Sequence, residues 1–369
     1  MKILFWTGYN DEVFKTMENV DSNFDSDRGW GSEGSLCRLA VGLNKLGHEV
    51  DIFGGLGMKS QGVNIMDYDA VIVQRYLNFL IYEDTNHPNI ILWLHDTIAL
   101  PWYKGLAIED SGKNLYELAA RNNIFRKSVV LTPFHERKIR SVYELPQGHF
   151  EVIGHGINQE IDTNDLTKKI PYRMIWTSDW LRGLKKTIQI MNYISPKEVA
   201  ISLEIFGEGS SPSRNLEYYD KENPTLRQVI EQSPHEIIIR PRVDNDELVA
   251  SWGKTDFWFY PTDFEETYCI TALEAQRAGA FCFTSNVGSL PDVIGDRGLI
   301  YHEGKNTEEY YMHLAKVLKY YLLNPEEISD IKSRGVEWAK TQTSINMAKQ
   351  WESLLLSGVN NFKFFEGRA

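Results

Sequence analysis

Short runs of β-branched and aromatic residues alternate along the whole chain with longer stretches of helical period. This alternation predicts an α/β fold, in which parallel strands form sheets with helices on both faces. The first helix is expected after 2–6, with Ser32 as its N-cap and Gly47 at its end. The expected strands are 2–6, 49–53, 70–73, 90–94, 129–131, 150–153, 173–177, 201–206, 237–240, 257–260, 281–284 and 299–301.

The apolar runs stop after residue 153, where glycine, asparagine, aspartate, threonine and lysine follow. Such a composition is typical of a linker. We therefore expect an N-terminal Rossmann-like domain at 1–155, a linker at 156–171 and a second Rossmann-like domain at 172–340. The tail at 341–369 is expected to be helical and to pack back toward the first domain.

Charge and cysteine content limit the classes of partner. The 369 residues carry a formal net charge of −12, so the chain as a whole is repelled by nucleic acid and by anionic membranes. An anionic ligand must therefore be small and bound by local positive groups. Cys37, Cys269 and Cys282 are widely spaced, which argues against a disulfide framework or structural zinc.

No apolar stretch approaches the roughly 18 residues of a membrane span or forms a secretory leader. We expect a soluble cytoplasmic protein without a transmembrane segment. Peripheral membrane contact and the oligomeric state stay open.

The segment 257–284 is the most informative part of the sequence. An apolar strand is followed by an acidic loop, a helix carrying Glu266 and Glu274, and another strand. If the helix begins just after Glu266, that carboxylate lies at its start and Glu274 lies about two turns further in, near the same face. The backbone N–H groups of Thr267, Tyr268, Cys269 and Ile270 would then form a cradle for an anion. The spacing fits equally well an acidic N-cap followed by a solvated glutamate.

This segment resembles the E-x7-E signature of family 4 retaining glycosyltransferases, which have the GT-B fold. Other landmarks agree in the same order: a glycine-rich loop at 29–33, an R-G-L step at 182–184, a G-x-G at 207–209 and an interdomain G-H-G-I-N at 154–158. The resemblance implies an α/β fold of two Rossmann-like domains with parallel sheets that face each other across a cleft. The acceptor belongs to the N-terminal domain and the nucleotide-sugar donor to the C-terminal one.

The resemblance also implies roles for the acidic and basic residues. Glu274 would accept hydrogen bonds from the ribose, and Glu266 would contact the transferred sugar as a catalytic residue. Arg182 would bind the diphosphate with its fork of donors, and Lys186 would add a point charge. The alternative for Arg182 is a surface ion pair at a helix start, which is the less favoured interpretation. For Lys186 a structural role is favoured.

Two glycines and a histidine complete the implied site. Gly31 and Gly207 would let the backbone approach the donor, as only a residue without Cβ can; Gly31 is otherwise an ordinary turn glycine. His95 stands at the end of an apolar strand and resembles the catalytic histidine that contacts the donor sugar. A loop-capping histidine is the alternative. His95 and Asp96 lack the companion ligands that a metal-dependent phosphohydrolase needs.

The sequence departs from the family at three places. His155 stands where asparagine is usual, and Thr177 and Ser178 stand where many members carry a basic residue before the R-G step. We therefore expect either weaker donor binding than in those members or another basic residue that takes the place of the missing one. The insert 9–28 is acidic, which disfavours an anionic acceptor, although a solvated loop explains it equally well.

These features predict an enzyme that moves a hexose from a nucleotide-diphosphate sugar to a hydroxyl acceptor, such as another sugar or glycan. Retention of configuration follows from the resemblance alone, and neither a metal nor a cofactor is expected. A non-catalytic carbohydrate- or nucleotide-sugar-binding protein on the same fold is the alternative. A nicotinamide or flavin oxidoreductase needs a G-x-G-x-x-G after the first strand, and the sequence has none there.

Overall fold

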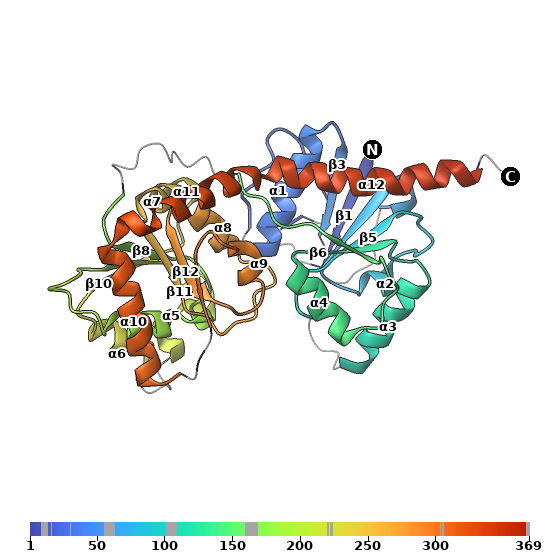
Figure 1. Cartoon of the computed structure of the whole chain (residues 1–369). Coiled ribbons are helices and arrows are strands. Elements are labelled where there is room, and N and C mark those ends of the chain that lie inside the picture. The colour runs from blue at the N-terminus through green and yellow to red at the C-terminus, as the bar shows by residue number, and fades with distance from the viewer. Residues whose placement is uncertain are drawn as a thin grey trace. The chain divides into compact units, whose positions relative to one another are not determined.

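The computed structural model describes residues 1–8, 14–15, 17–29, 31–54, 63–100, 109–158, 169–219, 221, 224–302, 304 and 306–366 (Figure 1). The chain divides into two compact units. Unit 1 comprises Met1–Asn158 and Gln342–Ala369, and unit 2 comprises Gln159–Thr341.

Unit 1 is built on a seven-stranded sheet in the order β2-β3-β1-β4-β5-β6-β7. Neighbouring strands are parallel except at one edge, where β2 runs antiparallel to β3. The predicted parallel sheet is thus present, with one short antiparallel strand added at its edge; the sequence did not indicate β2, because a two-residue strand in a polar insert carries no apolar pattern. The strands are β1 (Lys2–Thr7), β2 (Glu18–Asn19), β3 (Glu49–Gly54), β4 (Ala70–Gln74), β5 (Ile90–Trp93), β6 (Lys127–Val130) and β7 (Phe150–Val152).

The helices of unit 1 cover this sheet, with α12 beside α1 (Figure 1). A Cβ at Gly42 of α1 would lie 2.7 Å from the Cβ of Ala348, so the glycine allows α12 to pack closely. Trp351 of α12 also packs on Trp93, with ring centroids 5.1 Å apart. The helices are α1 (Gly31–Lys45), η1 (Ile65–Asp67), α2 (Phe79–Tyr82), α3 (Glu109–Arg121), α4 (Pro133–Val142) and α12 (Ser344–Glu366).

The ends of α1 test the expected caps. Gly47 has a φ of +90° directly after the helix, which confirms it as the stop. The prediction of Ser32 as the N-cap is wrong, because α1 already begins at Gly31, whose φ of +56° turns the chain into the helix. Ser32 is therefore inside the first turn, where its hydroxyl donates to Glu33 Oε2 (3.3 Å).

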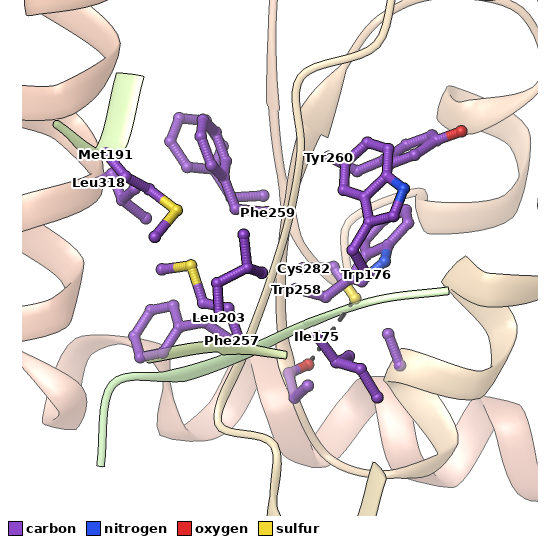
Figure 2. Close-up of a cluster of buried hydrophobic side chains, with 14 of the residues drawn as sticks. Ile175, Trp176, Met191, Leu203, Phe257, Trp258, Phe259, Tyr260, Cys282 and Leu318 are labelled. Atoms are coloured by element: carbon purple, nitrogen blue, oxygen red, sulfur yellow. Dashed lines mark hydrogen bonds between the residues drawn. The ribbon is translucent and has the colours of Figure 1, made fainter. Parts of the chain in front are cut away.

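Unit 2 is built on a six-stranded parallel sheet in the order β10-β9-β8-β11-β12-β13. The apolar run of β11 is buried on both faces, as parallel strands between helices require. Figure 2 shows Phe259 and Met191 on one side of the strands and Trp258 and Tyr260 on the other. The strands are β8 (Arg173–Trp176), β9 (Ser202–Glu208), β10 (Glu236–Pro241), β11 (Phe257–Tyr260), β12 (Phe281–Ser285) and β13 (Leu299–Tyr301).

The helices of unit 2 connect these strands, and α11 packs on α8. Every strand that the alternation predicted is present in the two units, with ends shifted by two residues or fewer. No helix among the described residues combines the length and apolarity that crossing a membrane requires. The helices are η3 (Trp180–Arg182), α5 (Leu184–Met191), η4 (Pro212–Arg214), η5 (Leu216–Tyr219), α6 (Leu226–Glu231), α7 (Asn245–Lys254), α8 (Ile270–Arg277), α9 (Leu290–Ile294), α10 (Glu308–Leu323) and α11 (Pro325–Thr341).

Candidate functional site

An ion pair lies at the carboxyl edge of the unit 2 sheet, where open α/β sheets place their ligands. Arg182, which ends η3, donates from Nη1 to both carboxylate oxygens of Glu266 at 2.9 Å. The hydroxyl of Tyr260, the last residue of β11, donates to Oε1 of the same carboxylate at 2.8 Å. The Arg182 guanidinium also lies over the Phe264 ring, 4.2 Å from its centroid. Two of the predicted site residues are thus in direct contact.

The protonation states of Arg182 and Tyr260 follow from their burial and from the charge of Glu266. Glu266 itself is only 4% exposed. Burial by itself lowers the pKa of Arg182, but the nearby carboxylate raises it overall, so the guanidinium keeps its charge. Burial, followed by the Glu266 charge, raises the pKa of Tyr260 well above its ordinary value. Tyr260 therefore remains a hydrogen-bond donor to Glu266.

The helix that follows Glu266 begins later than predicted. Helix α8 begins at Ile270 with Cys269 as its N-cap, so Thr267 and Tyr268 lie in the preceding loop. The predicted helix start is therefore wrong, and Thr267 and Tyr268 cannot offer helix N-terminal amides; their donor-binding role stays a prediction. Glu274 is half-buried in the second turn of α8, about one turn after the helix start rather than two.

A long-range contact explains this displacement. The carbonyl of Glu266 accepts a hydrogen bond from Ser289 N (2.8 Å), which ties the loop to the turn before α9. A Cβ at Gly288, whose φ is +62°, would lie 2.6 Å from the backbone N and O of Glu266. Glu266 is held against this turn and cannot join the helix.

Lys186 lies on α5 with only 7% of its surface exposed. Its Nζ is 2.5 Å from Oδ1 of Asp263, whose Oδ2 accepts a hydrogen bond from Asn306 (3.0 Å). This pairing ties α5 to the loop after β11 and agrees with the structural role that the sequence favoured. Between Arg182 and α5, Gly183 has a φ of +116° and a Cβ there would lie 3.0 Å from the carbonyl of Pro261.

Arg214 contacts two of the strand ends at this edge of the sheet, and the sequence patterns did not single it out. Gly207, predicted to face the donor, has a φ of +95°, and a Cβ there would lie 2.2 Å from Nη1 of Arg214. The guanidinium thus covers Gly207, and its Nη2 donates to the carbonyl of Thr177 (3.3 Å). Arg214 sits in a polar stretch without periodicity, so only the preceding G-x-G marked this region.

In unit 1, His95 follows β5 and is half-buried among polar and aromatic groups. Its Nε2 lies 3.4 Å from Nε2 of Gln74, which donates to the carbonyl of Ser32 (2.7 Å). The Trp93 ring lies 4.6 Å from the His95 ring, and His155 stacks on His95 at 5.5 Å with an interplanar angle of 15°. Burial, then the charges of His155 and neighbouring cations, lowers the pKa of His95, so the ring is neutral near pH 7.

The segment that carries His95 is held by its neighbours. Arg75 has a φ of +73°, rare for a residue with a side chain, and binds Asp96 with two hydrogen bonds of 2.6 and 2.8 Å. The carbonyl of Asp96 accepts from Nε2 of His135 (2.8 Å), whose Nδ1 accepts from Leu131 N (3.2 Å). Burial lowers the pKa of His135 to about 4, so this ring is neutral.

Gly31 is the first residue of α1, on the same unit as His95. Its neighbour Ser32 contacts Gln74, and among the described residues a Cβ on Gly31 would meet only Glu33 Oε2, at 4.0 Å. Its φ of +56° fits the alternative of a turn glycine. Trp30 of the glycine-rich loop lies outside the described residues.

The acidic insert and the linker are described only in part, since 9–13, 16 and 159–168 lie outside the described residues. Within the insert, Glu18 binds Arg28 at 2.9 and 2.8 Å, which neutralises one of its carboxylates. Among the described residues no three His, Cys, Asp or Glu side chains come together as a metal-binding group.

No protein-family model matches this chain, and no curated protein sequence matches it. Solved structures do resemble it. Sucrose-phosphate synthase from Thermosynechococcus elongatus is 12% identical, with a TM-score of 0.68 over 100% of both chains. HepE from Anabaena, solved with UDP, is 12% identical with a TM-score of 0.65, over 97% of this chain and 100% of HepE.

A third similar structure is the pneumococcal O-GlcNAc transferase GtfA, solved with UDP and GlcNAc. It is 12% identical with a TM-score of 0.57, and the alignment covers 81% of this chain but only 58% of GtfA. At such identities the likeness concerns the fold. This chain has the two-sheet α/β fold of the GT-B glycosyltransferases.

Proposed function

We propose that this chain is a glycosyltransferase of the family 4 type, which moves a hexose from a nucleoside-diphosphate sugar to a hydroxyl group of a sugar or glycan with retention of configuration. The observation that carries the proposal is the Arg182–Glu266–Tyr260 cluster at the carboxyl edge of the unit 2 sheet. It occurs on a fold shared with HepE, which was solved with UDP and with UDP-glucose.

Arg182 and Glu266 have complementary roles in this proposal. Departure of a nucleoside diphosphate leaves negative charge on the phosphates, and a preorganised guanidinium stabilises that charge without rearranging. Glu266 fixes the direction of Arg182 through Nη1, one of the three nitrogens of the fork. Its carboxylate accepts hydrogen bonds when ionised, so it also suits a hydroxyl of the transferred sugar.

Glu274 and the start of α8 complete the donor site that we propose. The backbone N–H groups of Ile270 and Thr271 lie in the first turn of α8, where a helix favours anions. Glu274, half-buried one turn later, is assigned to the ribose hydroxyls.

We assign the acceptor to unit 1, where His95 is the proposed catalytic residue. A neutral imidazole can donate one hydrogen bond and accept another, which suits sugar hydroxyls. Its neighbours Gln74 and Trp93 add a polar amide and an aromatic face. No metal is assigned a role, because the cations of the chain can carry the charge of the leaving group; activity should therefore survive chelation by EDTA.

The second candidate is a protein of the same fold that binds nucleotide sugars without transfer. It is favoured by the engagement of both predicted donor-site cations with carboxylates of the chain, Arg182 with Glu266 and Lys186 with Asp263. A ligand must compete with these pairs or bind beside them.

We also propose that the protein works in the cytoplasm. Cys37, Cys269 and Cys282 are buried free thiols, and burial raises the pKa of Cys37 to about 12. Such thiols suit a reducing compartment. Fractionation of the source cells, with washes at high salt, would separate a soluble from a peripheral membrane location.

One experiment separates the candidate functions. The purified chain is incubated with UDP-, GDP- and ADP-sugars, with and without sugar acceptors, and thermal stability is recorded in parallel with each nucleotide sugar and with NAD. Transfer or donor hydrolysis supports the enzyme, and NMR of the anomeric proton of the product tests retention. Stabilisation by a nucleotide sugar without turnover supports the binding protein. Stabilisation only by a dinucleotide such as NAD would contradict both.

A further inference from the structure

The loop after β9 folds back on itself at the carboxyl edge of the unit 2 sheet. Gly209 N donates to the carbonyl of Arg214 (2.8 Å), and Arg214 N donates to that of Ser211 (3.0 Å). The backbone N and the hydroxyl of Ser210 both donate to the carbonyl of Gly207, at 3.1 and 2.6 Å. These bonds fix the backbone of Arg214 beside the end of β9.

The side chain of Arg214 bridges two strand ends. It covers Gly207 of β9 so closely that a Cβ there would lie 2.2 Å from its Nη1, and it donates from Nη2 to Thr177, just after β8. Its exposed fraction is 8%. The glycine at 207 thus makes room for a guanidinium, and the guanidinium lies beside the segment that leads from Thr177 to Arg182.

One carboxylate and two further arginines interact electrostatically with this guanidinium. Burial lowers the pKa of Arg214, the carboxylate of Asp179 raises it, and the charges of Arg182 and Arg242 lower it further. Asp179 also accepts a bond from Leu181 N (3.0 Å) in its own loop and one from the Ser213 hydroxyl (2.6 Å) in the loop after β9. Arginines gathered at one strand edge repel each other, and a bound anion relieves that repulsion.

We infer that Arg214 is the second cation of the donor site and binds, together with Arg182, the two phosphates of the nucleoside diphosphate. This inference rests on the proposed function. Thr177 and Ser178 are uncharged, and the bond from Arg214 to Thr177 brings a guanidinium to the place that these residues leave without a cation. A planar fork held at two strand ends suits a diphosphate, which offers acceptor oxygens on two phosphorus atoms.

The test compares diphosphate with monophosphate binding by the full chain. Affinities of the wild type for UDP, GDP and ADP and for UMP, GMP and AMP are measured by calorimetry. The diphosphate and monophosphate of the base that binds most tightly are then used for the variants. The variant Arg214→Met retains the long stem that covers Gly207 and removes the charge. We expect it to bind the diphosphate about 10- to 100-fold more weakly, as for loss of a charged hydrogen bond, and the monophosphate within about threefold of wild type.

Two further variants control this result. Arg214→Lys should recover part of the diphosphate affinity, because it restores the charge without the fork. Arg227→Ala removes the same charge from the exposed face of α6 and should bind both nucleotides as the wild type does. Unchanged diphosphate binding by Arg214→Met overturns the inference. So does an equal loss for both nucleotides, since a merely structural role of the loop has that effect.

A third variant tests the inference if Arg214→Met does not fold. Arg182→Met leaves Arg214 in place, so it should keep a measurable preference for the diphosphate over the monophosphate. Loss of all preference would show Arg182 to be the only phosphate-binding cation and would overturn the inference. If the wild-type chain binds none of the six nucleotides, the proposed function fails and the inference fails with it. If the wild type binds a nucleoside diphosphate and Arg214→Met binds it equally well, only the inference fails.

Discussion

The two units differ in the chemistry at the carboxyl ends of their strands. In unit 2 the predicted site includes four charged side chains, and Glu266 among them contacts a guanidinium and a phenol. In unit 1 the corresponding edge presents His95 between Gln74, Trp93 and His155, and burial keeps its imidazole neutral. The same architecture thus carries a charged site on one unit and a mainly uncharged one on the other.

This difference shows how parallel α/β units become specialised. Strand ends and helix starts attract ligands in any such unit, so the side chains placed there decide the ligand. Charged forks select phosphates, whereas neutral imidazole and amide groups match the hydroxyls of a sugar. Each prediction below changes one side of this contrast.

The largest expected effect comes from Glu266→Gln, which removes the charge that holds Arg182. Glycosyl transfer should fall by at least about 100-fold, because the preorganised cation loses its partner. Stability should fall by roughly 1–3 kcal/mol, an ion-pair loss discounted because the Arg182 side chain is 36% exposed. Steady-state kinetics and urea unfolding measure these two effects.

The neighbouring exposed residue provides the matched control, since Glu265→Gln changes the same charge one position away. It should retain transfer and stability near wild-type values. Equal activity of both variants would remove Glu266 from the reaction.

The next largest effect is the loss of stability of unit 1 at acidic pH. Burial lowers the pKa of His135 and of His149 in unit 1 to about 4, and that of His155 to about 3, whereas unit 2 has His235 as its lowered histidine. A folded-state pKa below the unfolded value of 6.5 gives stability that is present above pH 6.5. That stability is lost as the pH falls toward the folded pKa. One histidine shifted to about 4 accounts for roughly 3 kcal/mol over this window.

Unit 1 should therefore lose protection before unit 2 between pH 6.5 and pH 4. Hydrogen exchange followed by mass spectrometry, corrected for the intrinsic pH dependence, reports each unit separately. His149→Gln can keep a hydrogen bond to the Ser128 hydroxyl and should flatten the pH dependence of unit 1. Simultaneous loss of protection in both units would contradict the contrast in buried histidines.

The sequence predicted the parts of the fold that depend on local pattern. Apolar runs such as 257–260 became strands because a buried parallel strand needs only its own side chains to be apolar. The edge strand β2 and the cap at Ser32 were not predicted correctly. A two-residue polar strand has no pattern, and the chain enters α1 through the backbone of Gly31.

The contacts among the candidate site residues were not predicted, and the roles of those residues stay predictions. Arg182 and Glu266 were identified, and their ion pair is a finding of the structure. The late start of α8 depends on Ser289 and Gly288, and the position of Arg214 depends on Gly207 and Thr177. Such contacts join residues far apart in the sequence, so no local period or spacing could reveal them.

A smaller effect is expected from Arg75→Ala in unit 1. The variant breaks the bidentate pair with Asp96 and shortens the side chain to its Cβ, so the unfavourable φ of +73° remains. Since both partners are about one quarter exposed, stability should change by about 1 kcal/mol or less. The loop of His95 loses this support, so kcat should fall about tenfold while KM for the donor changes little.

The matched control is Arg121→Ala, which breaks an exposed ion pair with Glu144 elsewhere in unit 1. It should leave kcat as in the wild type. If Arg75→Ala changes KM for the donor and leaves kcat unchanged, Arg75 takes part in donor binding. Unit 1 would then contribute a charged side chain to the donor site.

The smallest effect is expected from Lys186→Met, which tests whether every cation of the unit 2 site serves the phosphates. The lysine stem is buried and methionine fits the same path, whereas its partner Asp263 is 45% exposed and regains water when the ion pair is lost. Stability should therefore fall by less than about 1 kcal/mol. Diphosphate affinity should fall by no more than about threefold, measured by the calorimetry used for Arg214.

A loss as large as that expected for Arg214→Met would make Lys186 a phosphate ligand. Its pairing with Asp263 would then be the ligand-free state, which the donor displaces. In that case three cations of unit 2, Arg182, Arg214 and Lys186, would bind the phosphates. The charged strand ends of unit 2 would then differ even more from the neutral groups around His95 in unit 1.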